Sequence, residues 1–185
     1  MNQNPTLQRY NLLSQLFHWL VVALIIGLIV TNTLHQGAPD PSDLRVSSIK
    51  LHISLGILLF LVTIARILWA RISPQPTPID APRWTLVAAR LAHLALNFAT
   101  LLIPIFGYLR VVSKGRVAEF FGTPLPSIIG EAPWINDAMH IFHGEPMELF
   151  LYCLVGLHVA AALWHQYVRR DGSLERMLPW GGRAA

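Results

Sequence analysis

The stretch HGEPMELFLYCLVGLHVAAALWH, residues His143–His165, decides the fold of this chain. Its only carboxylates lie near its start, and a helix of this length would cross the ~30 Å hydrocarbon core of a bilayer. His158 lies deep in the apolar run, where an imidazole without a polar partner would be costly. Because histidine is the commonest ligand of metals and of haem iron, we ask whether other spans supply histidines at matching depths.

The composition of the whole chain is typical of an integral membrane protein. Of its 185 residues, 54% are hydrophobic and 13% are charged, against about 25% charged residues in an average soluble domain. The single cysteine, Cys153, excludes an intramolecular disulfide and a thiolate iron–sulfur cluster, and without a C-x-x-C-H motif any haem must be bound non-covalently. We expect membrane lipid, and not nucleic acid, as a partner.

Three further apolar runs precede this stretch, so the sequence predicts an all-α integral membrane protein, a four-transmembrane-helix bundle in a single membrane domain over residues 1–185. The expected spans are residues 16–34, 49–69, 86–109 and 146–168. Ser47 or Ser48 is expected to cap the second span. The segment 110–142 is too apolar for a disordered linker and too interrupted to cross, which indicates a folded, partly membrane-lying loop with a short helix around Asn136–Phe142.

The distribution of basic residues predicts that both termini are cytoplasmic. With the N-terminus inside, nine of the fourteen basic residues fall on the inner side, and the other five fall on the outer side. Cytoplasmic segments carry the excess of lysine and arginine in membrane proteins. The inner set is Arg9, Arg66, Arg71, Arg83, Arg90, Arg169, Arg170, Arg176 and Arg183, and the outer set is Arg45, Lys50, Arg110, Lys114 and Arg116.

Four histidines match in depth across these spans. His18 begins the first span near the inner side, and His52 begins the second span near the outer side. His143 precedes the fourth span on the outer side, and His158 follows it by fifteen residues, ~22 Å along a helix and on nearly the same face. Two pairs at two depths are what two bis-histidine haems in one bundle require. A single histidine at a helix end is usually just a polar residue at the membrane interface. The haem hypothesis therefore rests on all four histidines and their matching depths together.

Three more residues have two interpretations each. Arg66 lies fourteen residues after His52, where it would pair with haem propionates or extend its charge to the lipid headgroups. His93 and His165 lie towards the inner side, where they would replace His18 or His158 as ligands or line a quinone pocket with a proton-accepting imidazole.

The motifs along the chain resemble those of the bacterial cytochrome b561 family of small di-haem membrane proteins. The resemblance covers nearly the whole chain, in order and spacing, and GLHVAAALWH is its most specific element. The matching segments are FHWL (Phe17–Leu20), KLHISLG…R (Lys50–Arg66), PTP (Pro76–Pro78), RLAHL…LLIPIFGY (Arg90–Tyr108), FFG…LP (Phe120–Pro126), GLHVAAALWHQY (Gly156–Tyr167) and RDGSLERMLP (Arg170–Pro179).

The resemblance implies two non-covalent haem b groups with bis-histidine ligation, His18 with His158 and His52 with the histidine that opens the fourth span. The family commonly has His-Glu there, fourteen residues before the next ligand, whereas this chain has His143-Gly144-Glu145 and a spacing of fifteen. His143 is favoured, and His140 is the alternative. His93 and His165 fall on positions that lie, in the family, near the inner haem and a proposed quinone site.

The function that the resemblance implies is electron transfer across the bacterial inner membrane, from an outer-face donor to the quinone pool. One family activity is superoxide:ubiquinone oxidoreduction, and a basic outer rim would steer this small anion. Two alternatives remain: a haem subunit that docks a partner dehydrogenase or hydrogenase, and a non-redox channel or transporter with a histidine proton relay. The expected rim residues are Arg45, Lys50, Lys114 and Arg116.

Overall fold

The computed structural model describes residues 9–77, 79 and 81–179 of the chain. Two residues used in the sequence analysis lie outside these described residues. They are Pro78, which ends the PTP segment, and Arg183, which was counted among the inner basic residues.

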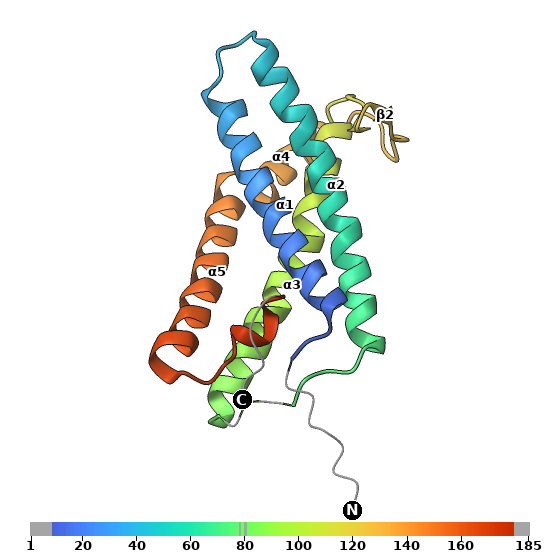
Figure 1. Cartoon of the computed structure of the whole chain (residues 1–185). Helices are drawn as coiled ribbons and strands as arrows, with labels where there is room; N and C mark the ends of the chain where they lie inside the picture. The colour runs from blue at the N-terminus through green and yellow to red at the C-terminus, as the bar shows by residue number, and fades with distance from the viewer. Residues whose placement is uncertain (1–8, 78, 80, 180–185) are drawn as a thin grey trace, which may run out of the picture.

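Four long helices make up the body of the described chain (Figure 1): α1 (Leu12–Gly37), α2 (Asp43–Ile72), α3 (Arg83–Val112) and α5 (Glu145–Trp164). The first three, and the segment Pro133–Arg169 that contains α5, are long and apolar enough to cross a membrane. A short π-helical turn, η1 (His165–Arg169), continues α5. The prediction of an all-α, multi-pass membrane protein is therefore confirmed.

The first three helices extend beyond the apolar runs from which their spans were predicted, and polar side chains cap the first turns of α1 and α2. Asn11 accepts a hydrogen bond from the Ser14 amide at the start of α1, and Ser42 does the same for Arg45 at the start of α2. The expectation that Ser47 or Ser48 caps the second span is wrong, since both residues lie inside α2.

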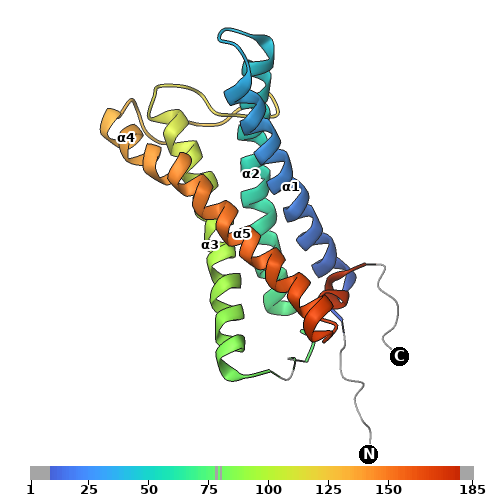
Figure 2. The same ribbon diagram turned by 90° about the vertical axis from the view of Figure 1, so that its left-hand side faces the viewer.

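The protein core lies between α1 and α2, which run antiparallel and side by side. Its buried residues are Val21, Leu24, Leu59 and Val62. α5 crosses the bundle obliquely, as Figure 2 shows, and contacts α3. All of α5 is described, and none of its residues is buried by the protein. The side of the bundle that faces α5 is thus less completely packed than the α1–α2 side.

One end of the bundle carries a β-hairpin and a short helix, α4 (Pro133–Phe142). Strands β1 (Glu119–Phe120) and β2 (Thr123–Pro124) pair antiparallel, and the turn residues Phe121 and Gly122 have φ of 48° and 85°. Positive φ at both positions is the geometry of a type I′ hairpin turn. The hairpin rests on α2, where the Ser54 hydroxyl accepts from the Phe121 amide at 2.9 Å. The sequence did not indicate this hairpin.

The C-terminal segment folds back over the start of α1 at the opposite end. After Arg170, whose φ is 53°, a 3-10 turn η2 (Glu175–Met177) returns the chain to the bundle. The Trp19 indole donates to the Met177 carbonyl at 2.9 Å, and the Tyr10 amide donates to the Arg176 carbonyl at 3.2 Å. Both ends of the described chain therefore lie at the same end of the bundle.

Candidate functional site

His52 and His143 face each other near the end of the bundle that carries α4. Their ring centres are 6.1 Å apart, and the ring planes are inclined by 72°. His52 projects from α2, and His143 is the residue that ends α4. His140 is exposed on α4 and is not part of this arrangement. The structure thus brings His143, and not His140, beside His52.

Each imidazole of the His52–His143 pair is held at its Nδ1 atom by a neighbouring helix. His52 Nδ1 lies 3.2 Å from the Leu28 carbonyl oxygen and 3.2 Å from Thr31 Oγ1, both on α1. His143 Nδ1 lies 2.8 Å from the Ile103 carbonyl oxygen on α3. A carbonyl oxygen can only accept, so the ring proton resides on Nδ1 and the Nε2 lone pair is free for a metal.

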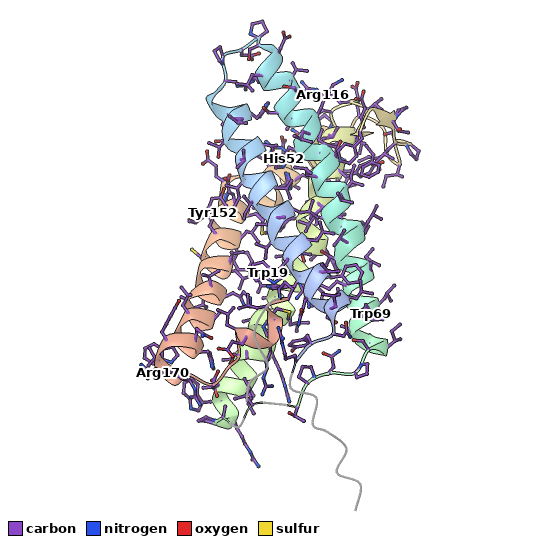
Figure 3. All side chains as sticks on the ribbon, in the orientation of Figure 1. Trp19, His52, Trp69, Arg116, Tyr152 and Arg170 are labelled. Carbon is purple, nitrogen blue, oxygen red and sulfur yellow. The ribbon has the colours of Figure 1, made fainter. Side chains whose placement is uncertain are left out.

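A second cluster gathers three histidines from three helices. The ring centre of His158 on α5 lies 6.4 Å from that of His18 on α1 and 5.5 Å from that of His93 on α3. Nδ1 of His18 is buried and has no hydrogen-bond partner among the described residues. The ring of Trp19, which is labelled in Figure 3, meets the His18 ring edge-on at 5.4 Å.

The Arg66 side chain adds a positive charge to this second cluster. Its guanidinium is close enough to act electrostatically on all three rings of the cluster. Within the described part of the chain, the ion pairs are made by Lys50, His165 and Arg169, and none involves Arg66. A partly buried arginine that forms no ion pair with a described carboxylate could bind an anionic group from outside the chain.

The two clusters lie at different depths. His52 contacts Thr31 on α1, and Thr31 follows His18 by thirteen residues of the same helix, or ~20 Å at the rise of an α-helix. In Figure 3, His52 lies nearer the end that carries α4, and Trp19, the residue after His18, lies further towards the opposite end.

His165 takes no part in the second cluster. Its Nδ1 lies 2.5 Å from Asp171 Oδ2, in the segment that follows η1. Burial alone would raise the pKa of the Asp171 carboxyl, but hydrogen bonds from Ser173 and His165 outweigh this effect and lower the pKa to about 2. Asp171 is therefore ionised and holds the His165 ring in one orientation.

Both histidine pairs have the spacing that a six-coordinate haem iron needs. Metal–imidazole bonds are about 2 Å long, and the ring centre lies ~1 Å beyond the nitrogen, which places two opposed ring centres about 6 Å apart. The observed separations are 6.1 Å and 6.4 Å. The described residues contain no cluster of histidine, cysteine and carboxylate side chains that could hold a bare metal ion. A haem, whose macrocycle supplies four ligands itself, fits two-histidine sites of this kind.

Sequence reasoning missed two polar groups near the His52–His143 pair. Thr31 lies in an apolar run and contacts His52. Glu148 on α5 accepts hydrogen bonds from Asn32 at 3.1 Å and from the Tyr152 hydroxyl at 2.5 Å, and it acts electrostatically on both rings of the pair. These groups could have been noticed in the sequence, because a polar side chain inside a membrane span needs a polar partner.

Comparison with known proteins gives the same result over nearly the whole chain. Residues 9–180 match the family described as prokaryotic cytochrome b561. Cytochrome b561 homolog 2 of Escherichia coli K12 is 32% identical to the chain over 96% of its length and 95% of the relative. Cytochrome b561 homolog 1 of the same organism is 24% identical over 88% and 92%. A probable superoxide oxidase CybB of Yersinia pestis is 27% identical over 93% and 97%.

Three observations lead to one assignment. The described part of the chain has four apolar helices, histidines are paired across them, and a family match extends from Arg9 to the C-terminal segment. The alternative of a non-redox channel is wrong, because the matched family consists of cytochromes. This chain belongs to the prokaryotic cytochrome b561 family of multi-pass membrane electron-transfer proteins, which contain haem b.

Proposed function

We propose that the protein carries two haems and oxidises a small donor, superoxide, at its outer face while reducing a quinone at its inner face. The pairing of four histidines at two depths, with ring centres 6.1 Å and 6.4 Å apart, carries this proposal. The similarity to a relative named probable superoxide oxidase supports the choice of donor.

We assign His52 and His143 as axial ligands of the outer haem b, and His18 and His158 as axial ligands of the inner haem b. Bound haem iron supplies one-electron redox chemistry that no amino-acid side chain of these spans offers. His93 is assigned to the surroundings of the inner haem, because its ring centre lies only 5.5 Å from that of His158, closer than two opposed bonds of about 2 Å allow.

Arg66 is assigned to the haem propionates at the inner site. Its guanidinium acts on His18, His93 and His158 and is not used in an ion pair with any described carboxylate. A bidentate arginine–carboxylate contact is short and strong. This interpretation replaces the alternative in which the side chain reaches the lipid headgroups.

Superoxide is expected to approach over the outer end of α3. Arg110 donates from Nη1 to the His143 carbonyl oxygen at 2.6 Å, and burial together with Arg110 and Arg116 lowers the pKa of Lys114. These three cations form a positive patch beside the outer pair, and such a field raises the local concentration of a small anion. Of the other expected rim residues, Lys50 pairs with Glu119 at 3.3 Å and Arg45 holds the α1–α2 loop.

Quinone reduction is proposed at the inner end, near His93 and His165. Two superoxide anions lose one electron each and become O2, and a quinone that takes these two electrons needs two protons to become a quinol. His165, held by Asp171, is a suitable proton donor. A cavity of about 520 Å³, lined partly by Gln166, Arg170 and Asp171, lies on the Asp171 side of this pair and would connect Asp171 to water. The quinone is expected to be ubiquinone.

The protein is proposed to reside in the bacterial inner membrane with both termini cytoplasmic. The excess of basic residues at the end that carries the termini supports this orientation. It places the His18 cluster near the cytoplasm and the His52–His143 pair near the outer face, so that superoxide and the protons for the quinone come from opposite sides of the membrane.

Stopped-flow spectroscopy of the purified protein in detergent tests this function. Superoxide should reduce the b-type haem bands within the mixing experiment, and added ubiquinone should re-oxidise them. His165→Ala should keep the full haem content and slow only the re-oxidation. If superoxide leaves the bands oxidised while a co-purifying dehydrogenase or hydrogenase reduces them, the partner-docking alternative is correct.

A charge series tests the positive patch. Replacement of Lys114 and Arg116 by glutamine should slow reduction by superoxide and weaken its dependence on salt, because the steering field is screened over ~10 Å at 0.1 M salt. The matched control replaces Arg169 and Arg170 by glutamine at the other end of the bundle. Equal rates in both double variants would exclude steering by this patch.

A further inference from the structure

A glycine of α3 makes room for the ring of His143. A Cβ atom at Gly107 would lie 2.6 Å from Cε1, 2.9 Å from Nε2 and 3.0 Å from Nδ1 of His143. Carbon atoms pack at about 3.5–4.0 Å, so any side chain at position 107 would push the imidazole away from α3. The ring can therefore lie against the backbone of α3 only because residue 107 has no side chain.

Two more groups of α3 hold His143 in this place. The Ile103 carbonyl oxygen lies 2.8 Å from His143 Nδ1, and Arg110 donates to the His143 carbonyl oxygen at 2.6 Å. Residues 103, 107 and 110 share one face of a helix, since they follow each other at intervals of four and three. This face of α3 thus contacts both the ring and the backbone of His143.

A second glycine sets the direction from which His143 enters. α4 ends at Phe142 and α5 begins at Glu145, so the chain must turn within two residues. A Cβ atom at Gly144 would lie 2.2 Å from the His140 carbonyl oxygen, a rigid backbone atom. The turn that directs His143 inward and leaves His140 on the exposed side of α4 therefore requires glycine at position 144.

We propose that Ile103, Gly107, Arg110 and Gly144 form a socket that positions His143 as an axial ligand of the outer haem and excludes His140 from this role. This inference rests on the proposed function, because it takes the His52–His143 pair as a haem site. The four residues are positioning residues that act through His143. The extra residue between His143 and His158, compared with the usual spacing of fourteen, is accommodated in the turn at Gly144.

The test compares three glycine-to-alanine variants of the full-length protein. Gly107→Ala and Gly144→Ala alter the socket, and Gly156→Ala is the matched control on α5, where an added Cβ would meet no atom within 4 Å. The readouts are the haem-to-protein ratio from the pyridine haemochrome spectrum, the low-spin electron paramagnetic resonance signals and the midpoint potential of each haem.

If these residues position His143, the two socket variants should affect only the outer haem. Gly107→Ala should lose about half of the haem, or keep both haems with one resonance signal and one midpoint potential shifted, while the inner haem is unchanged. Gly144→Ala should behave in the same way, and Gly156→Ala should match the unaltered protein. If Gly107→Ala keeps both haems with unaltered signals and potentials, the socket does not position the ligand.

Two further variants keep the inference testable if alanine at position 107 prevents folding. Arg110→Gln removes the bond to the His143 carbonyl without adding an atom, and it should shift the resonance signal of one haem only. His140→Ala should keep both haems, and loss of the outer haem from this variant would overturn the socket. An unaltered protein that binds fewer than two haems contradicts the proposed function instead, which separates the two failures.

Discussion

Replacing Thr31 by valine tests how His52, the proposed ligand of the outer haem, is held. The change preserves shape and removes the hydroxyl that lies 3.2 Å from His52 Nδ1. Because this hydroxyl donates to the Gly27 carbonyl at 2.8 Å, it must accept from the imidazole. The Leu28 carbonyl, also 3.2 Å from Nδ1, remains as an acceptor after the substitution. His52 should therefore keep its tautomer and its place in the helix.

The magnitude follows from the loss of one of two shared acceptors. A neutral hydrogen bond contributes about 1 kcal/mol net, which corresponds to about a fivefold weaker affinity for the outer haem. Complete loss of the hydrogen-bond partner of a metal-bound histidine lowers metal affinity about 10–100-fold. The expected effect is smaller than this, because His52 keeps the Leu28 carbonyl as a partner. The affinity of the inner haem should not change.

The assay is the rate of haem transfer to an excess of a haem-free acceptor protein, followed optically. Thr100→Val is the matched control, because Thr100 is equally buried and its hydroxyl bonds only to carbonyls of its own helix. We expect Thr31→Val to release one haem faster than the unaltered protein does. Thr100→Val should release both haems at the unaltered rate. Equal release from both variants would refute the account of how His52 is held.

Three further predictions follow from other parts of the structure. Arg66→Gln should lower the midpoint potential of the inner haem, since loss of a positive charge favours the ferric state; a redox titration that shows only the outer haem shifted would contradict this. The pKa of the Asp171 carboxyl is lowered from its ordinary value of 3.8 to about 2, so its contacts should stabilise the C-terminal segment equally at every pH above 3.8 and weaken as the pH falls towards about 2. The Ser173 amide donates to Asp171 at 3.1 Å. Its hydrogen exchange should therefore become faster only between pH 3.8 and about 2. Leu59→Ala in the α1–α2 core should lower the free energy of unfolding by about 2 kcal/mol, because a membrane protein loses packing contacts but little hydrophobic driving force at such a site. Leu61 is 50% exposed, so Leu61→Ala should lower the free energy of unfolding far less. Unfolding titrations in detergent compare the two variants.

The fold was largely predictable because four apolar runs in so short a chain leave few architectures. A bilayer requires every spanning backbone to satisfy its own hydrogen bonds, so each run had to be a helix. The helix ends were less predictable, since Ser42 and Asn11 cap turns that lie outside the apolar runs. The hairpin of β1 and β2 depends on the contact between Phe121 and Ser54, which are 67 residues apart in sequence.

The pairing of histidines was predictable from depth alone, but the way His143 is presented was not. The sequence argument extended one helix from His143 to His158, whereas the structure ends α4 at Phe142 and starts α5 at Glu145. Which histidine faces His52 depends on the carbonyl of Ile103 and on the space above Gly107. These are tertiary contacts between α3 and the turn, and no local pattern encodes them.

Haem stoichiometry tests the central claim most directly. The pyridine haemochrome spectrum of purified protein should give two haem b per chain, with His143→Ala and His158→Ala each retaining one and the double variant retaining none. The two single variants should also differ in which of two midpoint potentials is lost from a redox titration. One haem per chain in the unaltered protein, or two in either single variant, would contradict the assignment of two bis-histidine sites.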